Sequence, residues 1–360
     1  MDFAFTEEQQ EIRALARRIF RDRVTPDRLK EVEAGSEGFD RDLWRELGTA
    51  NLLAVALPED VGGSGYGFLE LCIVLEEAAT AAAPVPVYPA LVLAGLPIAA
   101  FGSPELKSRF LPSLAAGESV LTAPLGDADM TAHSEPDTWR LEGTAQMVPV
   151  AQSAERALVP ARVDDGSVGL FLVDPRQARL ERQQLTDGET AFRVEIHGSV
   201  SSEDVLAEPP KGDEIVRWTL DRAAAALSVM QIGFAERALR MTAEYTSGRE
   251  QFGRPLATFQ AVQQRLADAY IDVEALRWTA WRAAWRLSRD LPAEEEIAVG
   301  KFWAAEAGSR VTAAAQHLHG GIGVDVDYPL HRYTKHAKQA ELVGGGATEH
   351  LAHLGELIAR

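Results

Sequence analysis

Four positions in the last third of the chain have the chemistry to hold a phosphorylated, aromatic ligand. Arg249 carries a planar guanidinium that can bind a phosphate bidentately, and Phe252 offers a flat face to an adenine ring. Gln316 can donate and accept hydrogen bonds, and Gly320 allows a ligand to approach the backbone closely. Taken singly, Arg249 could equally be a solvated charge at a helix end, and a lone Phe is more often a core contact. The residues alone leave both interpretations open.

The run Gly344-Gly345-Gly346 comes directly before a predicted helix. Successive backbone N–H groups at such a position can form an anion-binding nest. Three glycines are equally typical of a flexible loop that leads into a helix. Glu341 and Glu349 flank the run, and both are expected to face solvent. The run itself has no group that could act as an acid or a base.

The hydrophobic periodicity predicts three segments that would position these residues. From Thr6 to about Gly117 the apolar residues recur at helical spacing. Between about Glu118 and Pro210, short apolar runs separated by Gly, Asp and Pro predict strands. From Glu214 onward the helical spacing returns in long elements with short connections, which is typical of an antiparallel four-helix bundle. We therefore predict an N-terminal helical domain at 1–117, a middle β domain at 118–212 and a C-terminal bundle at 213–360.

Composition narrows the classes of function. The chain has 360 residues, 46% of them hydrophobic and 25% charged, which is enough for several domains with ordinary cores. Its net charge of −18 argues against a nucleic-acid partner, because clustered Lys and Arg drive that binding. No run approaches the roughly 20 apolar residues of a membrane helix and no signal peptide is apparent, so a cytoplasmic location is expected. The single cysteine, Cys72, is expected to be buried, and no metal site is predicted.

Several motifs follow one another in a fixed order. The N-terminal segment contains Asp2-Phe3 ahead of Thr6-Glu7-Glu8-Gln9, then LPEDVGG at 57–63 and GSPELK at 102–107. The C-terminal segment contains REQFGRP at 249–255, FQAV at 259–262 and QHLHGGIG at 316–323. Each motif is weak alone, but together their order and spacing resemble the acyl-CoA dehydrogenase family over essentially the whole chain.

The resemblance implies an α+β fold with an N-terminal helical domain, a middle β-barrel or sandwich domain and a C-terminal four-helix bundle. It implies FAD as cofactor, an acyl-CoA substrate and an electron-transfer flavoprotein as electron acceptor. In the family, the positions matching Arg249, Phe252, Gln316 and Gly320 reach across a dimer interface to the pyrophosphate and adenosine part of a neighbour's FAD. The resemblance therefore favours cofactor binding at all four positions.

Two motifs that hold the flavin ring in the family are degraded in this chain. The family's T-E-P-G-A-G-S-D stretch corresponds to TAPLGDAD at 122–129, which keeps Pro and Gly but loses most of the signature. The family's W-[IS]-[TS] motif corresponds to Met147-Val148-Pro149. Pro149 can offer neither a hydroxyl nor an N–H to the flavin.

The catalytic base of the family is also missing. Abstraction of the α-proton of an acyl thioester needs a carboxylate beside the substrate while the flavin takes the β-hydride. The family pattern [YW]-E-G-[TS] aligns with GGGA at 344–347, so Gly345 stands in place of the glutamate and Ala347 in place of a phosphate-binding hydroxyl. Some family branches carry the base glutamate on the first long bundle helix, at a position matching Asp221. Aspartate is about 1 to 1.5 Å shorter, and beside Arg222 it is also typical of a structural pair at a helix start.

The losses follow a pattern: groups that serve the chain's own flavin site are degraded, and groups that complete a neighbour's FAD site remain. This pattern predicts the non-catalytic subunit of a heteromeric α2β2 acyl-CoA dehydrogenase. It resembles the two-gene actinobacterial branches, including those that shorten steroid side chains, in which a homologous partner supplies the base. One alternative is a self-sufficient acyl-CoA dehydrogenase that uses Asp221 as base. Another is a scaffold that binds acyl-CoA without redox chemistry.

Overall fold

The computed structural model describes residues 4–359, so the Asp2-Phe3 pair of the first motif lies outside the described residues. Within this range helices, then strands, then helices follow one another along the chain, which confirms the predicted α+β class. The chain divides into two compact units, which are described separately. The bundle unit comprises Met1–Pro26, Cys72–Ala83 and Ala224–Arg360, and the sheet unit comprises Asp27–Leu71 and Pro84–Ala223.

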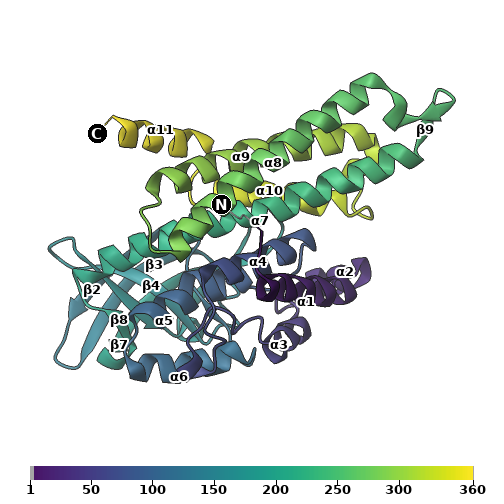
Figure 1. The fold of residues 1–360 in the computed structure, drawn as a ribbon. Helices are drawn as coiled ribbons and strands as arrows, with labels where there is room; N and C mark the ends of the chain where they lie inside the picture. Colours follow the sequence, from purple (N-terminus) through teal and green to yellow (C-terminus); the bar gives the residue numbers. More distant parts are fainter. Residues whose placement is uncertain (1–3, 360) are drawn as a thin grey trace. The chain divides into compact units, whose positions relative to one another are not determined.

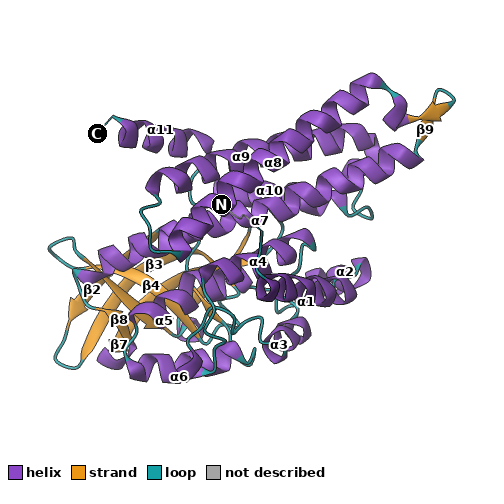
Figure 2. Ribbon diagram, viewed as in Figure 1, coloured by secondary structure: helices purple, strands orange, loops and turns teal. Residues whose placement is uncertain are grey.

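The sheet unit contains a central mixed β-sheet, drawn in orange in Figure 2. The strand order is β6-β7-β3-β2-β4-β5-β8, with β1 parallel beside β4. The strands are β1 (Leu121–Thr122), β2 (Ala128–Ser134), β3 (Thr138–Pro149), β4 (Arg156–Arg162), β5 (Val168–Val173), β6 (Arg179–Gln184), β7 (Thr190–Ser201) and β8 (Val205–Ala207).

Apolar side chains on one face of the sheet form its core. Leu141, Phe171 and Val194 are fully buried there, and the Trp139 ring packs against Phe171 with centroids 5.5 Å apart. Burial of each such side chain contributes roughly 1.5–3 kcal/mol to stability. Strand β5 is buried along its whole length because it lies between β4 and β8. The edge strand β6 instead carries charged and amide side chains, which discourage pairing with a further strand.

Short helices complete the sheet unit. Two of them start at side-chain caps, because Asp40 accepts from the Leu43 N–H and Ser103 accepts from the Leu106 N–H. The buried Trp44 donates its indole N–H to the Ser119 carbonyl at 3.0 Å, which fixes its helix to the segment before β1. The elements are α2 (Pro26–Ala34), α3 (Arg41–Thr49), η1 (Glu59–Val61), η2 (Tyr88–Gly95), α5 (Leu96–Phe101), α6 (Pro104–Ala115), η3 (Pro175–Gln177) and η4 (Ser202–Asp204).

The bundle unit is made of long helices. Its helices are α1 (Glu7–Arg23), the second half of α4 (Phe68–Thr80), most of α7 (Lys211–Gly248), α8 (Gln260–Ser288), α9 (Glu294–His319), α10 (Leu330–Leu342) and α11 (Ala347–Ile358). A short hairpin of β9 (Glu250–Gln251) and β10 (Arg254–Pro255) joins α7 to α8 and projects from their ends (Figure 1). The single cysteine, Cys72, is buried in α4, as predicted. None of the helices within residues 4–359 is both long and apolar enough to cross a membrane.

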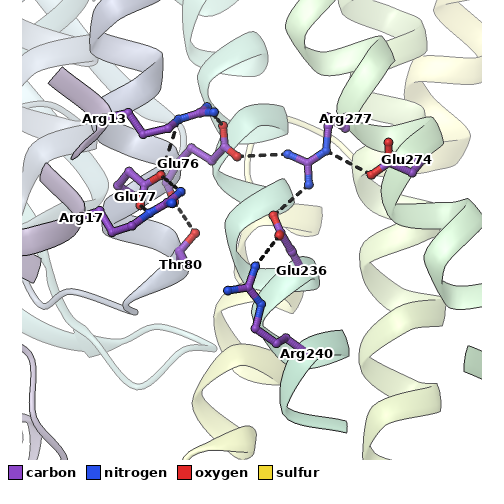
Figure 3. A network of polar contacts seen from close by, with 9 residues as sticks. All are labelled: Arg13, Arg17, Glu76, Glu77, Thr80, Glu236, Arg240, Glu274 and Arg277. Atoms are coloured by element: carbon purple, nitrogen blue, oxygen red, sulfur yellow. Dashed lines mark hydrogen bonds and ion pairs between the residues drawn. The ribbon is translucent and has the colours of Figure 1, made fainter. Parts of the chain in front are cut away.

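A network of charged side chains holds the bundle unit together (Figure 3). The buried Glu76 of α4 binds Arg13 of α1 at 2.9 Å and Arg277 of α8 at 3.2 Å. Arg277 also binds Glu236 of α7 at 2.8 Å. Burial raises the pKa of the Glu76 carboxyl, which the two arginines oppose. The network therefore joins four helices, because Glu76 of α4 binds α1 and α8 and Arg277 connects α8 to α7.

Candidate functional site

The β9–β10 hairpin carries two of the predicted ligand-binding residues. Arg249 is exposed and directly follows α7, and its main chain is fixed by hydrogen bonds to Tyr245 and Leu256 of 2.8 Å each. Phe252 is 92% exposed, so the alternative that it is a core contact is wrong. Its ring touches only the edge of Phe259 among the aromatic rings of the described residues, with centroids 6.2 Å apart. The hairpin thus presents a guanidinium and an aromatic face to the outside of the chain.

The tip of this hairpin is conformationally strained. Phe252 and Gly253 form the two-residue turn, and both have positive φ, at 57° and 78°. That combination is typical of a type I′ turn, in which a bulky residue such as Phe is rarely found at the first position. The strain of such a residue costs about 1–3 kcal/mol and recurs at functional sites. An exposed Phe held in this conformation favours a binding role.

The other two predicted residues lie at the end of α9. Gln316 is half-buried and Gly320 is exposed. Gly320 ends the helix with φ 64° and ψ −142°, a conformation that glycine adopts far more readily than other residues. The ring of His319 stacks on Tyr245 of α7 with centroids 4.4 Å apart, which brings the ends of α7 and α9 together. All four predicted residues therefore lie at the same end of the bundle unit.

His319 was not predicted as a functional residue, although it lies inside the QHLHGGIG motif. It is buried, its Nδ1–H donates to the Ala315 carbonyl at 2.8 Å, and its Nε2 accepts from the Tyr328 hydroxyl at 3.1 Å. Burial lowers the pKa of this imidazole. A histidine three residues after the candidate ligand-binding residue Gln316 is a signal, but only the fold reveals its aromatic neighbours.

Hydrogen bonds hold the start of the Gly344-Gly345-Gly346 loop and the helix end before it. Gly344 and Gly345 have φ of 73° and 94°, and the His350 Nε2–H of α11 donates to the Gly344 carbonyl at 2.9 Å. The ammonium of the fully buried Lys301 donates to the Ala340 and Glu341 carbonyls at 2.7 and 3.1 Å. These carbonyls close α10, so the lysine complements its negative helix end. Burial lowers the pKa of Lys301 to about 8.

The two acidic residues beside this loop differ in exposure. Glu349 is exposed, as predicted, whereas Glu341 is half-buried and binds Lys338. The expectation that Glu341 faces solvent is therefore wrong in part, because the (i, i+3) pair draws its carboxylate along the helix. An ideal Cβ atom on Gly345 would lie 2.5 Å from Glu349 Oε2. The exposed Glu349 carboxylate would have to move to admit a side chain there, and the φ of 94° would strain it.

In the sheet unit, the two degraded flavin motifs hydrogen-bond to each other. The buried Thr122 hydroxyl donates to the Pro149 carbonyl at 2.8 Å, and the Leu125 N–H donates to the Met147 carbonyl at 3.1 Å. The Met147 N–H donates to Gln183 Oε1 at 2.9 Å, beside an irregularity in the β3–β7 register between Ala145 and Val148. The Thr122 hydroxyl and the Leu125 and Met147 N–H groups of these motifs are thus used inside the chain.

Asp221 lies in the part of α7 that belongs to the sheet unit, and it is half-buried. Its neighbour Arg222 stacks over the Trp218 ring at 3.6 Å and donates to the Trp218 carbonyl at 3.3 Å. Trp218 in turn meets Phe101 edge to face, with centroids 5.0 Å apart. This side of α7 is therefore packed with aromatic side chains next to Asp221.

Known proteins resemble this chain along its whole length. The family patterns described as Acyl-CoA dehydrogenase, N-terminal domain and Acyl-CoA dehydrogenase, C-terminal domain match residues 6–118 and 211–357. Acyl-CoA dehydrogenase FadE27 of Mycobacterium tuberculosis is 39% identical over 374 residues, which cover 100% of this chain and 99% of the relative. The chain belongs to the acyl-CoA dehydrogenase family.

Solved structures of other acyl-CoA dehydrogenases share its fold closely. The ChsE4-ChsE5 complex from Mycobacterium tuberculosis contains a chain that is 39% identical, with a TM-score of 0.94 over 100% of this chain and 99% of that one. The Tcur3481-Tcur3483 steroid ACAD G363A variant contains a chain that is 44% identical, with a TM-score of 0.90 over 98% of both chains. Butyryl-CoA dehydrogenase from Megasphaera elsdenii is 25% identical, with a TM-score of 0.92 over 100% of both chains.

Proposed function

We propose that this acyl-CoA dehydrogenase chain is the base-lacking subunit of a heteromeric, FAD-dependent enzyme. The observation that carries the proposal is the internal pairing of the two degraded flavin motifs, above all the buried Thr122–Pro149 hydrogen bond. Because the Thr122 hydroxyl and the Leu125 and Met147 N–H groups already have acceptors within the chain, they would gain little by binding a flavin ring. Its exposed hairpin, in contrast, is free to reach a cofactor held by a neighbour.

The residues at the end of the bundle unit fit the distal half of a dinucleotide. Arg249 would bind the pyrophosphate, Phe252 would stack on the adenine, and Gln316 and Gly320 would contact the intervening groups. When bound, FAD supplies the acceptor for the β-hydride of the acyl-CoA. The carboxylate that removes the α-proton would come from the homologous partner, because Gly345 offers no titratable group.

Two similar chains come from structures whose names join two components, ChsE4-ChsE5 and Tcur3481-Tcur3483, and the second is called a steroid ACAD. These names support a heteromeric assembly, for which we propose α2β2 stoichiometry, and a bulky acyl group such as a steroid side chain as substrate. We extend both to this chain, with an electron-transfer flavoprotein as the electron acceptor.

The decisive experiment compares the chain alone with the chain co-expressed with a homologous partner that carries the glutamate and the W-[IS]-[TS] motif. The isolated chain should be colourless, and the complex should contain the two subunits at equal stoichiometry with one FAD per pair. Only the complex, and not the isolated chain, should reduce an artificial electron acceptor when acyl-CoA is supplied as the electron donor. An isolated chain that is yellow and active would contradict the proposal, and a complex without flavin would favour an acyl-CoA-binding scaffold.

Replacement of Arg249 by Met should weaken FAD retention by the complex about 10- to 100-fold, because a charge-assisted bidentate contact is lost. Equilibrium dialysis of the complex against graded FAD concentrations would measure the change. Arg289 is a matched control, because it is likewise exposed and likewise follows the last residue of a long bundle helix. Its replacement by Met should leave FAD retention unchanged. Equal losses in both variants would contradict the assignment of Arg249.

Replacement of Asp221 by Asn tests the alternative in which this chain supplies its own base. In the proposed assembly the turnover of the complex should stay within about twofold of wild type, since the partner carries the base. A general base contributes about 10²- to 10⁴-fold to the rate, so a loss of that size in steady-state turnover would identify Asp221 as the base. Asparagine keeps the shape of the side chain, which separates this effect from a packing defect.

A further inference from the structure

His319 makes a set of contacts that none of the roles above explains. Its ring lies between two phenols: it stacks on Tyr245 at an interplanar angle of 19° and meets Tyr328 at 50°. Tyr245 belongs to α7, and Tyr328 follows the 3-10 turn η6 (Gly320–Val324). The imidazole therefore connects the end of α7 to the segment that leaves α9.

The hydrogen bonds of this ring define its neutral form. The Ala315 carbonyl can only accept, so the proton lies on Nδ1, and the Tyr328 hydroxyl donates to the free Nε2. The main chain of Tyr328 is also held, because the His331 Nδ1–H donates to the Tyr328 carbonyl at 2.8 Å. A protonated His319 would have to reverse the bond to Tyr328 and bury a positive charge, which burial opposes.

The segment 320–328 is mostly exposed. It begins at Gly320, whose φ of 64° is open to glycine, and it exposes three apolar side chains: Ile322, Val324 and Val326, at 39%, 64% and 70%. Its one buried residue within η6 is Gly323, where an added Cβ atom would lie 3.0 Å from the Cβ atom of His319. His319 thus contacts this segment both through the Tyr328 hydroxyl and beside Gly323.

We propose that His319 is a positioning residue whose neutral imidazole, clasped between Tyr245 and Tyr328, fixes the segment 320–328 and thereby orients Gln316 and Gly320. We call these three residues the His319 latch. The role of Gln316 and Gly320 in cofactor binding rests on the proposed function, whereas the latch itself rests only on this chain. The latch fixes both the helix end that carries Gln316 and the turn that starts at Gly320.

The latch should respond to pH. The folded-state pKa of His319 lies below its ordinary value of 6.5, so the latch is fully formed above pH 6.5 and weakens as the pH falls from 6.5 through the folded-state pKa. Other charged or titratable groups near the latch come from α7 and from the start of α10. They are Glu244 and Arg237, which act on Tyr328, and His331, which binds its carbonyl.

Hydrogen exchange of the purified chain tests the latch, with rates corrected for the intrinsic effect of pH. In wild type, amides of 320–328 should exchange up to about tenfold faster at pH 5.5 than at pH 7.5. Tyr328→Phe should speed their exchange by about 2- to 10-fold at pH 7.5, because one hydrogen bond is lost. His319→Gln should abolish the pH dependence, and His317→Gln, which changes an exposed neighbour on the same helix turn, should preserve it.

Several outcomes would overturn the latch. One is unchanged exchange in Tyr328→Phe, and another is pH dependence that persists in His319→Gln, which would assign it to His331. The pH series on wild type requires no mutation, so the test survives if a variant does not fold. FAD retention by the co-expressed complex then tests the link to the cofactor: it should fall in Tyr328→Phe, and a normal value would overturn the positioning role. A complex without flavin would contradict the proposed function but not the exchange result.

Discussion

Replacement of Gly345 by Glu should not turn this chain into a self-sufficient dehydrogenase, although it restores the residue type that the family uses as base. The backbone at Gly345 has φ of 94°, and the new Cβ atom would lie 2.5 Å from Glu349 Oε2. The hydrogen bond from His350 to the Gly344 carbonyl fixes the loop in this shape. The new side chain would be held in a strained conformation beside another carboxylate. Steady-state turnover of the isolated variant should show none of the 10²- to 10⁴-fold gain that a working base provides.

A stability measurement isolates the backbone part of this effect. Gly345→Ala should lower the free energy of unfolding by about 1–3 kcal/mol, because alanine is strained at this φ. Gly346→Ala is the matched control in the same loop, since Gly346 has φ −87° and no atom within 4 Å of an added Cβ. Gly346→Ala should leave the free energy of unfolding unchanged or raise it by up to about 1 kcal/mol. Chemical denaturation of both variants would measure the difference, and equal free energies of unfolding would contradict it.

Replacement of Arg277 by Met should destabilise the chain by about 3–5 kcal/mol, because it removes one of the two arginines that bind the buried Glu76. Arg240→Met is the matched control, because it also removes an arginine from Glu236 but breaks an exposed (i, i+4) pair. Such a pair contributes only about 0.3–0.5 kcal/mol. Denaturant unfolding would measure the loss of unfolding free energy in each variant. Similar losses in the two variants would show that the buried network has no special weight.

The stability lost in Arg277→Met should depend on pH in a defined direction. Burial raises the folded-state pKa of Glu76 above its ordinary value of 4.5, and loss of Arg277 removes an opposing effect. In the folded variant Glu76 therefore keeps its proton to a higher pH than in the unfolded chain. The loss of unfolding free energy is smallest below pH 4.5 and grows as the pH rises through the folded-state pKa of Glu76. A second change, Glu76→Gln, should recover part of the stability at neutral pH, because it removes the buried charge. A deficit that shrinks as the pH rises would contradict this explanation.

Periodicity and motif order were enough to predict the architecture. The change of period near Glu118 and again near Glu214 marks the strands and the long helices, because burial of one face imposes these repeats on the sequence. The same reasoning identified Arg249 and Gln316 as candidates, since their side-chain chemistry is visible without coordinates. Their arrangement at one end of the bundle depends on the stack of Tyr245 and His319, which are 74 residues apart in the numbering.

Other features could not be predicted because they depend on pairing between distant segments. Thr122 and Pro149 belong to the two motifs that were recognised as degraded, but their mutual hydrogen bond arises only when β1 and the end of β3 meet. Lys301 gave no signal in the sequence, since its function is to bind the carbonyls that end another helix. Phe252 was open to a core interpretation because exposure is a property of the folded hairpin.

The exposed hairpin tip also bears on how the chain behaves before it assembles. An isolated molecule would keep Phe252 in water together with Val324 and Val326, which are 92%, 64% and 70% exposed. Apolar groups in this setting favour self-association. We therefore expect the chain to aggregate when it is produced in excess over its partner, and balanced synthesis of the two subunits would then protect it.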